Sequence, residues 1–352
     1  MSDSSPVVDR DRMMRAIDVA SRARHRASPN PWVGVTLVQT DGSIAWGATQ
    51  SYGGNHAEVE ALEAADNTEG AIVYTTLEPC NHQGRTGPCT EALIEAGVAR
   101  VVIGIEDPDP LVAGTGIARL RDAGIEVDVG VAAEEVERQL RPYVHHRRTG
   151  RPWVVLKLAA TIDGRVAAPD GSSQWITGPE ARADVHRLRA ESDAILVGAG
   201  TVRTDDPALT VRDWPPAELR IDPAGVRNPR RVVLGSAPEG AKVHPCLEFD
   251  GEIPDLLDQL GADGVVQLMI EGGPRVAHAF HHPRLVNEYV VYVAPALFAG
   301  SDAAGLFAGT GAMSIEGVWR GEFEDVTTLG RDLRITMLPA ADGPGGDDPV
   351  EG

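Results

Sequence analysis

The sequence has few lysines and few cysteines, and each shortage excludes a class of protein. Lys157 and Lys242 are the two lysines among 352 residues, so almost all positive charge is carried by arginine. The three cysteines, Cys80, Cys89 and Cys246, are odd in number and unevenly placed, which excludes a disulfide framework. Thiols without disulfide partners favour a reducing compartment.

The sequence also lacks long apolar runs and an excess of positive charge. No apolar run reaches the roughly 18 residues of a membrane-spanning helix, and residues 1–6 lack the pattern of a secretory signal. A net charge of −20 argues against a nucleic-acid-binding surface. We therefore expect a cytoplasmic protein with no membrane or nucleic-acid partner. At about 100–200 residues per domain, the chain is long enough for two domains.

The most distinctive stretch is residues 55–89, which holds two of the three cysteines. His56-x-Glu58 opens it, and Cys80 and Cys89, each directly after a proline, close it. One imidazole and two thiolates are typical ligands of a catalytic zinc site, whose fourth position is left to water. The zinc deaminase pattern is His-x-Glu followed by Pro-Cys-x-x-Cys. The first half matches, whereas eight residues instead of two separate the cysteines here.

The residue types in this stretch suit hydrolytic deamination. Bound zinc lowers the pKa of water to about 7, so hydroxide is available at neutral pH to attack an amidine-type carbon. Glu58, beside the ligand His56 but not itself a ligand, suits the transfer of a proton to the departing ammonia. Taken singly, a His-x-Glu is usually a solvated helix turn and a cysteine a buried small hydrophobe. Together, the three candidate ligands favour a zinc site.

Helix and strand patterns alternate along both halves, which predicts an α/β fold with helices covering sheets. In the first half we expect helices over residues 11–25, 56–66, 89–96, 114–123 and 132–146, and strands over 33–38, 44–48, 71–77, 100–105 and 125–129. In the second half we expect helices over 179–190, 254–261 and 274–281, and strands over 153–160, 194–198, 231–234, 265–270, 288–294 and 323–338. Residues 147–152 form the expected boundary, and residues 341–352 an acidic, disordered tail.

Two glycine-containing segments of the second half, residues 198–201 and 271–274, each follow an expected strand. Either would present backbone N–H groups to a phosphate at a helix start. Neither completes the Gly-x-Gly-x-x-Gly fingerprint of a dinucleotide-binding domain, and tight structural turns are the simpler explanation. Glu271, a charged residue at the end of an apolar strand, suits either a functional role or a helix N-cap.

Further motifs run through the chain in a fixed order. They are Pro29-Asn30-Pro31, His56-Ala57-Glu58, Thr76-Leu77-Glu78-Pro79-Cys80, His82, Gly84-Arg85-Thr86, Pro88-Cys89, Asp107-Pro108, Lys157, Asp163-Gly164-Arg165, Ser173-Gln174-Trp175-Ile176-Thr177, Gly200-Thr201-Val202, Asp206-Pro207 and Glu271-Gly272-Gly273-Pro274. On these motifs, the chain apart from its tails resembles the bifunctional riboflavin-biosynthesis family, a pyrimidine deaminase fused to a pyrimidine reductase. That family shows the eight-residue cysteine spacing. The segment 214–249 departs from its pattern, with Gly235 where many relatives carry aspartate.

The resemblance implies a cytidine-deaminase-like zinc domain over residues 1–148 and a dihydrofolate-reductase-like domain over 149–340. The first domain would use one zinc ion to deaminate 2,5-diamino-6-ribosylamino-4(3H)-pyrimidinone 5′-phosphate. The second would use NADPH to reduce 5-amino-6-(5-phosphoribosylamino)uracil to the ribityl product. The resemblance also implies a homo-oligomer, either a dimer or a tetramer.

The resemblance assigns site residues position by position. The zinc ligands would be His56, Cys80 and Cys89, with Glu58 as the proton donor. The NADPH-binding residues would be Ala159, Trp175, Thr201, Asp205, Gly273, Pro274, Arg275, Val276, Ala277, His278 and Ala279. The substrate-binding residues would be Ser173, Arg189, Leu209, Arg212 and Glu271, among which the two arginines suit a bidentate grip on phosphate.

Two other functions remain open from the sequence. One is a single-activity zinc nucleobase or nucleoside deaminase whose C-terminal half is non-catalytic; it would release ammonia without oxidising NADPH. The other is a non-catalytic, zinc-stabilised binding protein, for example one that acts on RNA. The acidic charge speaks against the latter, and Glu58 would have no task in it.

Overall fold

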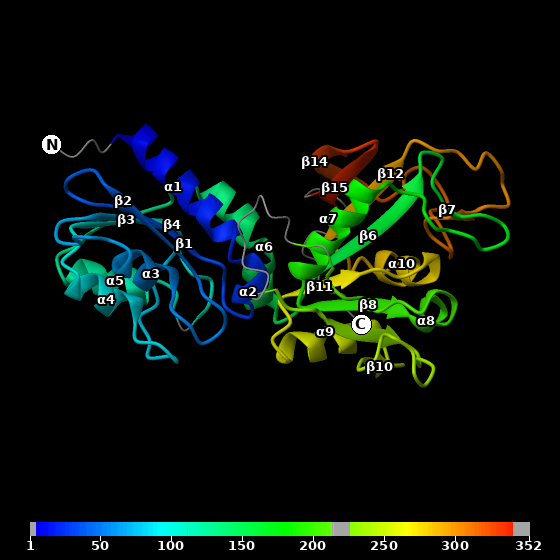
Figure 1. The fold of residues 1–352 in the computed structure, drawn as a ribbon, viewed down its shortest axis with the longest axis horizontal. Coiled ribbons are helices and arrows are strands. Elements are labelled where there is room, and N and C mark those ends of the chain that lie inside the picture. Colours follow the sequence, from blue (N-terminus) through cyan, green and yellow to red (C-terminus); the bar gives the residue numbers. More distant parts are fainter. Residues whose placement is uncertain (1–4, 111, 213, 215–225, 341–352) are drawn as a thin grey trace. The chain divides into compact units, whose positions relative to one another are not determined.

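The computed structural model describes residues 5–110, 112–212, 214 and 226–340 (Figure 1). Its chain forms two compact units. Met1–Arg151 with Ile221–Arg227 make up the first, and Pro152–Arg220 with Asn228–Gly352 make up the second. The expected acidic tail at residues 341–352 lies outside the described residues. Among the described helices, none has both the length and the apolar character needed to cross a lipid bilayer.

The first unit is built on a five-stranded mixed sheet in the order β2-β1-β3-β4-β5. The strands are β1 Gly34–Val38, β2 Ile44–Ala48, β3 Ile72–Leu77, β4 Arg100–Ile105 and β5 Glu126–Val129. β1 runs antiparallel to both β2 and β3, whereas β3, β4 and β5 are parallel. The hairpin expected at Asp41-Gly42 is confirmed, with Gly42 at a φ of 87°. The carboxyl ends of the parallel strands therefore share one edge of the sheet.

Helices cover both faces of this sheet. They are α1 Pro6–Ser21, α2 Arg24–Ala27, α3 Ala57–Glu63, α4 Cys89–Glu95, α5 Thr115–Asp122 and α6 Ala133–Thr149. α1 and α6 lie on one face, and α3, α4 and α5 on the other (Figure 1). Two glycines allow this close packing: a Cβ at Gly34 would overlap the Ala16 carbonyl of α1, and one at Gly47 would overlap the Ala57 carbonyl of α3. The hairpin is thus in backbone contact with a helix on each side.

The second unit contains an eight-stranded sheet in the order β10-β9-β8-β11-β6-β12-β15-β14. Its strands are β6 Trp153–Thr161, β8 Ala194–Gly198, β9 Arg230–Leu234, β10 Leu247–Phe249, β11 Gln267–Ile270, β12 Glu288–Ala294, β14 Gly321–Leu329 and β15 Asp332–Pro339; β7 Arg165–Ala167 and β13 Ala304–Gly305 form a separate pair. The six strands from β10 to β12 are parallel, and β15 and β14 add an antiparallel hairpin at one edge.

The central parallel strands of the second sheet are buried on both faces, as their near-continuous apolar sequences predict, whereas the edge strand β14 is largely exposed. Alternate residues of β6 enter different cores: Val154, Leu156 and Leu158 pack with α9 Ile253–Ala262 and α10 Pro274–His281, whereas Trp153 and Val155 pack with α7 Pro179–Ala190. This alternation follows from the two-residue period of a strand. The expected α/β class is therefore confirmed in both units.

The differences from the expected elements have local causes. The first helix starts at Pro6 instead of residue 11, because Ser5 caps it by accepting a hydrogen bond from the Val8 N–H at 3.3 Å and proline suits the first helical position. The turn expected at residues 198–201 is instead the start of helix α8 Ala199–Asp205. α6 continues to Thr149, into the segment expected to be the boundary.

We predict that Gly47→Ala destabilises the first unit, because its methyl group would overlap the α3 backbone. Overpacking of this kind costs about 1–3 kcal/mol of unfolding free energy. Urea denaturation followed by circular dichroism measures the change. Gly87→Ala is the matched control, since a Cβ there meets nothing within 4 Å. Equal midpoints for the two variants would contradict the close approach.

Candidate active sites

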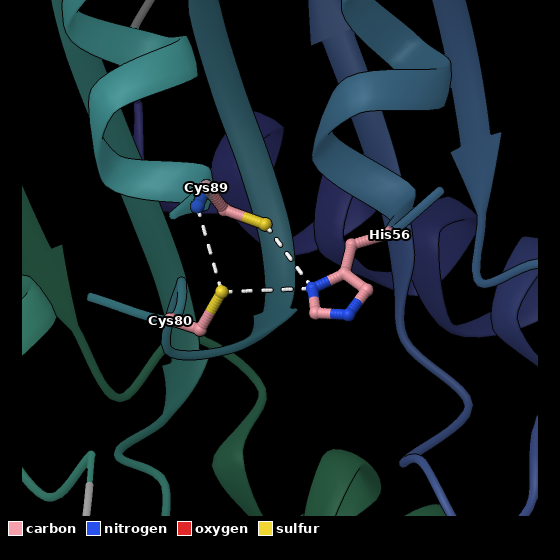
Figure 2. Close-up of side chains that lie close together, drawn as sticks. All are labelled: His56, Cys80 and Cys89. Atoms are coloured by element: carbon pink, nitrogen blue, oxygen red, sulfur yellow. Dashed lines mark hydrogen bonds between the residues drawn. The ribbon is translucent and has the colours of Figure 1, made fainter. Parts of the chain in front are cut away.

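Three segments of the first unit bring the predicted zinc ligands together (Figure 2). His56 is the N-cap residue of α3 and has extended backbone angles. Cys80 lies just beyond the carboxyl end of β3, and Cys89 is the first residue of α4. The helix start predicted at Cys89 is confirmed. All three side chains point into one space between the strand end and the two helix starts (Figure 2).

The donor atoms have the spacing of ligands that share one ion. His56 Nδ1 lies 3.6 Å from Cys80 Sγ and 3.3 Å from Cys89 Sγ. With Zn–N of about 2.0–2.1 Å and Zn–S of about 2.3 Å, a nitrogen and a sulfur of one tetrahedron lie about 3.5 Å apart. Both cysteines are free of disulfides, so both sulfurs are available. The residues present therefore fit a zinc ion with three protein ligands.

The electrostatics of the cluster favour an anionic sulfur. A hydrogen bond from the Cys89 thiol, aided by His56, lowers the pKa of Cys80 to about 4, whereas the Cys89 pKa is raised because its proton is held in that bond. The hydrogen bond to Cys80 in turn raises the pKa of His56. The Cys89 backbone N–H, at the start of α4, also donates to Cys80 Sγ at 3.4 Å. One thiolate is thus already stabilised by the fold, which suits capture of a cation.

Glu58 lies inside the first turn of α3 and is buried. Burial raises the pKa of Glu58 to about 7, although the neighbouring His56 opposes this shift. A carboxyl group with a pKa near neutrality exchanges protons readily in either direction. Its side chain lines the same cavity as His56 and Cys80. The predicted proton-transfer residue therefore sits beside the predicted ligands.

A second buried carboxylate, Glu78, holds the strand end that carries Cys80. Its two oxygens accept four backbone hydrogen bonds, from the N–H groups of Asp107, Gly114, Gly116 and Ile117, at 2.9–3.2 Å. These donors belong to the loop after β4 and to the first turn of α5. The carboxylate thus ties the two parallel strand ends to one another.

His56 and Cys80 open onto a cavity of about 420 Å³, within the range of small-molecule sites. Its lining includes Asn30, His82, Arg85 and Asp107, which belong to the family motifs but were not assigned a role from the sequence. Tyr52 and Tyr143 also line the cavity. The Arg85 guanidinium stacks over the Tyr52 ring at 4.5 Å. The presence of Asn30, His82, Arg85 and Asp107 in the family motifs was the available signal for these four residues.

The predicted cofactor residues gather at the carboxyl ends of two neighbouring parallel strands of the second unit. Thr201 and Asp205 lie on α8, directly after β8, and Gly273 is the N-cap of α10, after β11. A Cβ built at Gly273 would lie 3.8 Å from Thr201 Oγ1, so the two helix starts are adjacent. The carboxyl edge of a parallel sheet is where such folds bind nucleotides. Ala159 lies on β6, the other neighbour of β11.

Glu271 forms a bidentate ion pair with Arg189 of α7, with N···O distances of 2.7 and 2.8 Å. Both side chains are about nine-tenths buried. Arg189 keeps the pKa of Glu271 below its usual range despite burial, and Lys157 adds a further positive charge. The N-cap alternative for Glu271 is wrong, because Gly273 holds that position. The fork of Arg189, expected to grip phosphate, is therefore directed at Glu271.

The remaining predicted substrate residues do not all lie with this pair. Leu209 is buried at a φ of 53°, and the Thr210 carbonyl accepts from Arg189 Nη1 at 3.0 Å. The exposed Arg212 follows on the same segment. Ser173 instead lines a separate depression of about 310 Å³, together with residues 296–298 and the exposed Trp175, which belongs to the predicted cofactor set.

Comparison with known families and proteins agrees with both halves of this description. Residues 7–105 match the cytidine and deoxycytidylate deaminase zinc-binding region, and residues 152–335 match the RibD C-terminal domain. The riboflavin biosynthesis protein RibD of Escherichia coli is 39% identical over 363 residues, which cover 93% of this chain and 98% of that protein. That of Mycobacterium tuberculosis H37Rv is 41% identical over 340 residues, covering 92% and 95%.

Solved structures show the same arrangement along nearly the whole chain. Acinetobacter baumannii RibD superposes with a TM-score of 0.89 at 35% identity, covering 96% of this chain and 100% of that one. A diaminohydroxyphosphoribosylaminopyrimidine deaminase/5-amino-6-(5-phosphoribosylamino)uracil reductase from Thermotoga maritima gives a TM-score of 0.82 at 30% identity, covering 95% and 99%. Both are similar over the two units, so the likeness is not confined to one domain.

We predict that Asp107→Asn changes how the stability of the first unit depends on pH. Burial raises the pKa of Asp107 to about 6, against hydrogen bonds from the Asp109 N–H and the Tyr143 hydroxyl. The folded state thus favours the protonated acid, and this contribution is lost as pH rises through 6. Relative to the variant, the wild type should lose up to about 3 kcal/mol between pH 4 and 8.

Urea unfolding at a series of pH values measures this difference. A difference between Asp107→Asn and wild type that stays constant across the series would show that Asp107 titrates normally. Asp122→Asn, an exposed change in the same unit, controls for the loss of one negative charge.

Proposed function

The chain belongs to the RibD family of bifunctional riboflavin biosynthesis enzymes, and from this membership we propose which residues perform its two reactions. It is a zinc-dependent deaminase of 2,5-diamino-6-ribosylamino-4(3H)-pyrimidinone 5′-phosphate and an NADPH-dependent reductase of 5-amino-6-(5-phosphoribosylamino)uracil. The single-activity deaminase is disfavoured, because the second half matches the reductase domain.

In the first unit, His56, Cys80 and Cys89 hold the zinc ion and Glu58 moves the proton. Bound zinc supplies a Lewis acid that makes water nucleophilic at neutral pH. Glu58 would accept a proton from the water that adds to the amino-bearing ring carbon. It would then pass this proton to the amino nitrogen, so that ammonia leaves as the C–N bond breaks. The supporting observation is the buried Glu58 carboxyl beside three donor atoms at ligand spacing.

In the second unit, α8 and the start of α10 hold NADPH. Thr201, Asp205 and residues 273–279 contribute, because their two helix starts are adjacent at the carboxyl edge of the sheet. Ala159 and Trp175 complete the expected cofactor set. NADPH supplies the hydride, so the protein's task is to place the ribosyl carbon against the nicotinamide.

Arg212 is the main contact of the substrate phosphate, and Arg189 positions Glu271. Arg212 is exposed on the segment beside the Arg189–Glu271 pair. Arg189 already donates hydrogen bonds to both Glu271 oxygens and to the Thr210 carbonyl. Arg189 keeps one further N–H on each terminal nitrogen for substrate. Glu271, Leu209 and Ser173 complete the substrate set.

The chain is expected to act in the cytoplasm as a homo-oligomer, either a dimer or a tetramer. The zinc ligands Cys80 and Cys89 must stay reduced, which a reducing compartment ensures. Light scattering after size-exclusion chromatography gives the oligomeric state directly.

We predict that Glu58→Gln lowers the deamination rate by about 10²–10⁴-fold, the usual contribution of general acid–base catalysis. Zinc content and NADPH binding should stay at wild-type values. Ammonia release and NADPH absorbance, followed together on the diaminopyrimidinone substrate, report both reactions in order. Glu63→Gln, an exposed change on the same helix, should leave both rates intact. Full activity in Glu58→Gln would remove Glu58 from the mechanism.

We predict that Arg212→Ala raises the reductase KM for the phosphorylated uracil by about 10–100-fold, because a hydrogen bond to a charged group is worth about 1.5–3 kcal/mol. Deamination and NADPH affinity should not change. Steady-state kinetics of NADPH oxidation measure the effect, with the exposed Arg320→Ala as the charge-matched control. A fall in kcat at unchanged KM would instead assign Arg212 to the chemical step.

A further inference from the structure

A second cluster of metal-binding side chains lies in the second unit, apart from the residues assigned above. His244, Cys246 and Glu248 are spaced two residues apart, before and on strand β10 Leu247–Phe249. One potential ligand atom from each lies within 4.8 Å of the others. The cluster therefore presents a nitrogen, a sulfur and a carboxylate oxygen to one point.

The spacing matches that of the zinc ligands in the first unit. His244 Nδ1 lies 3.4 Å from Cys246 Sγ, compared with 3.6 and 3.3 Å for the two His–Cys pairs of the first unit. Two ligands of one tetrahedral zinc ion lie about 3.5 Å apart. The pair is thus placed as ligands of a common ion.

The tautomer of His244 is set by a backbone contact. Its Nε2 lies 3.1 Å from the carbonyl oxygen of Pro238. A carbonyl only accepts, so in this contact Nε2 carries the proton and Nδ1 of the neutral ring keeps a free lone pair. Metal-binding histidines almost always donate their second ring N–H in this way. The free lone pair is on the nitrogen that faces Cys246.

The third ligand and the local charge also suit a divalent cation. Glu248 Oε1 accepts from the Ala237 N–H at 3.1 Å, which anchors the side chain and leaves Oε2 for an ion. A thiolate and a carboxylate together balance a charge of +2. Arg231 donates to the Pro245 carbonyl at 3.2 Å and puts one positive charge beside the turn. The anionic ligands offset this repulsion. Burial and the neighbouring Glu248 raise the pKa of the Cys246 thiol, although Arg231 opposes this, so a bound ion would have to displace the thiol proton.

We propose that His244, Cys246 and Glu248 form a second zinc site, with water in the fourth position. Histidine, cysteine and carboxylate ligands are the set that zinc takes in proteins. The ion would fasten the three-residue strand β10 to residues 237–244, the turn that precedes it. The site lies outside the residues assigned above to the two reactions.

Zinc content of the full-length enzyme tests the proposal. After equilibration with zinc and gel filtration, elemental analysis should give about two ions per chain for the wild type and about one for Cys246→Ser. Glu239→Gln, an exposed charge loss in the same turn, should keep both. NADPH binding confirms that each variant is folded. One ion in the wild type, or two in Cys246→Ser, would overturn the proposal.

Thiol labelling gives a second measurement that does not depend on stoichiometry. Cys246 is the remaining cysteine once Cys80 and Cys89 hold the first ion, so a chromogenic disulfide reagent reports on it. Added zinc should slow its labelling, and Glu248→Gln should raise the zinc concentration required by about 10–100-fold. Glu239→Gln should behave as wild type. Labelling of Cys246 that zinc does not slow, or equal protection in Glu248→Gln, would show that these side chains do not share an ion.

Discussion

The buried carboxylate of Glu78 is the interaction on which the first active site depends. A buried carboxylate destabilises the folded state unless it is hydrogen-bonded. Glu78 accepts hydrogen bonds from four backbone N–H groups, in the loop after β4 and at the start of α5. Glu78 lies 29 to 39 positions before these donors in the sequence. By joining them, Glu78 fixes the end of β3, and Cys80 follows two residues later. The position of Cys80, a proposed zinc ligand, is thus determined by a side chain that is not among the proposed ligands.

Sequence patterns predicted the first unit well because its signals are local. Apolar runs predicted the strands, Asp41-Gly42 predicted the hairpin, and the helix-forming residues after Cys89 predicted the start of α4. The convergence of His56, Cys80 and Cys89 followed from ligand chemistry alone. The four-donor role of Glu78 had no such signal, because its partners, at residues 107–117, are brought to it by the parallel pairing of β3 and β4.

The second unit was harder to predict, since its site is assembled from strand ends distant in the chain. Arg189 and Glu271 form an ion pair although they lie 82 positions apart. No sequence signal near either residue predicts this pair. Helix α8 was expected to be a turn because Gly200 weakens helix propensity, by about 1 kcal/mol. The end of β8 and the packing of Gly198 against Val276, 2.8 Å from a built Cβ, set the local geometry instead. Tertiary contacts therefore determined the structure of residues 199–205, where the local helix propensity is weak.

Gly47 illustrates how a position without a side chain determines metal chemistry. The Ala57 carbonyl of α3 rests on its backbone, and His56 is the residue immediately before Ala57. Because Gly47 has no side chain, α3 can approach the sheet closely. This approach sets the distance between His56 and the sheet that carries Cys80. Natural variation at Gly47 should be limited by zinc affinity as well as by packing. A search for metal-site residues by their donor atoms would overlook Gly47, although this position sets the distance between His56 and the sheet.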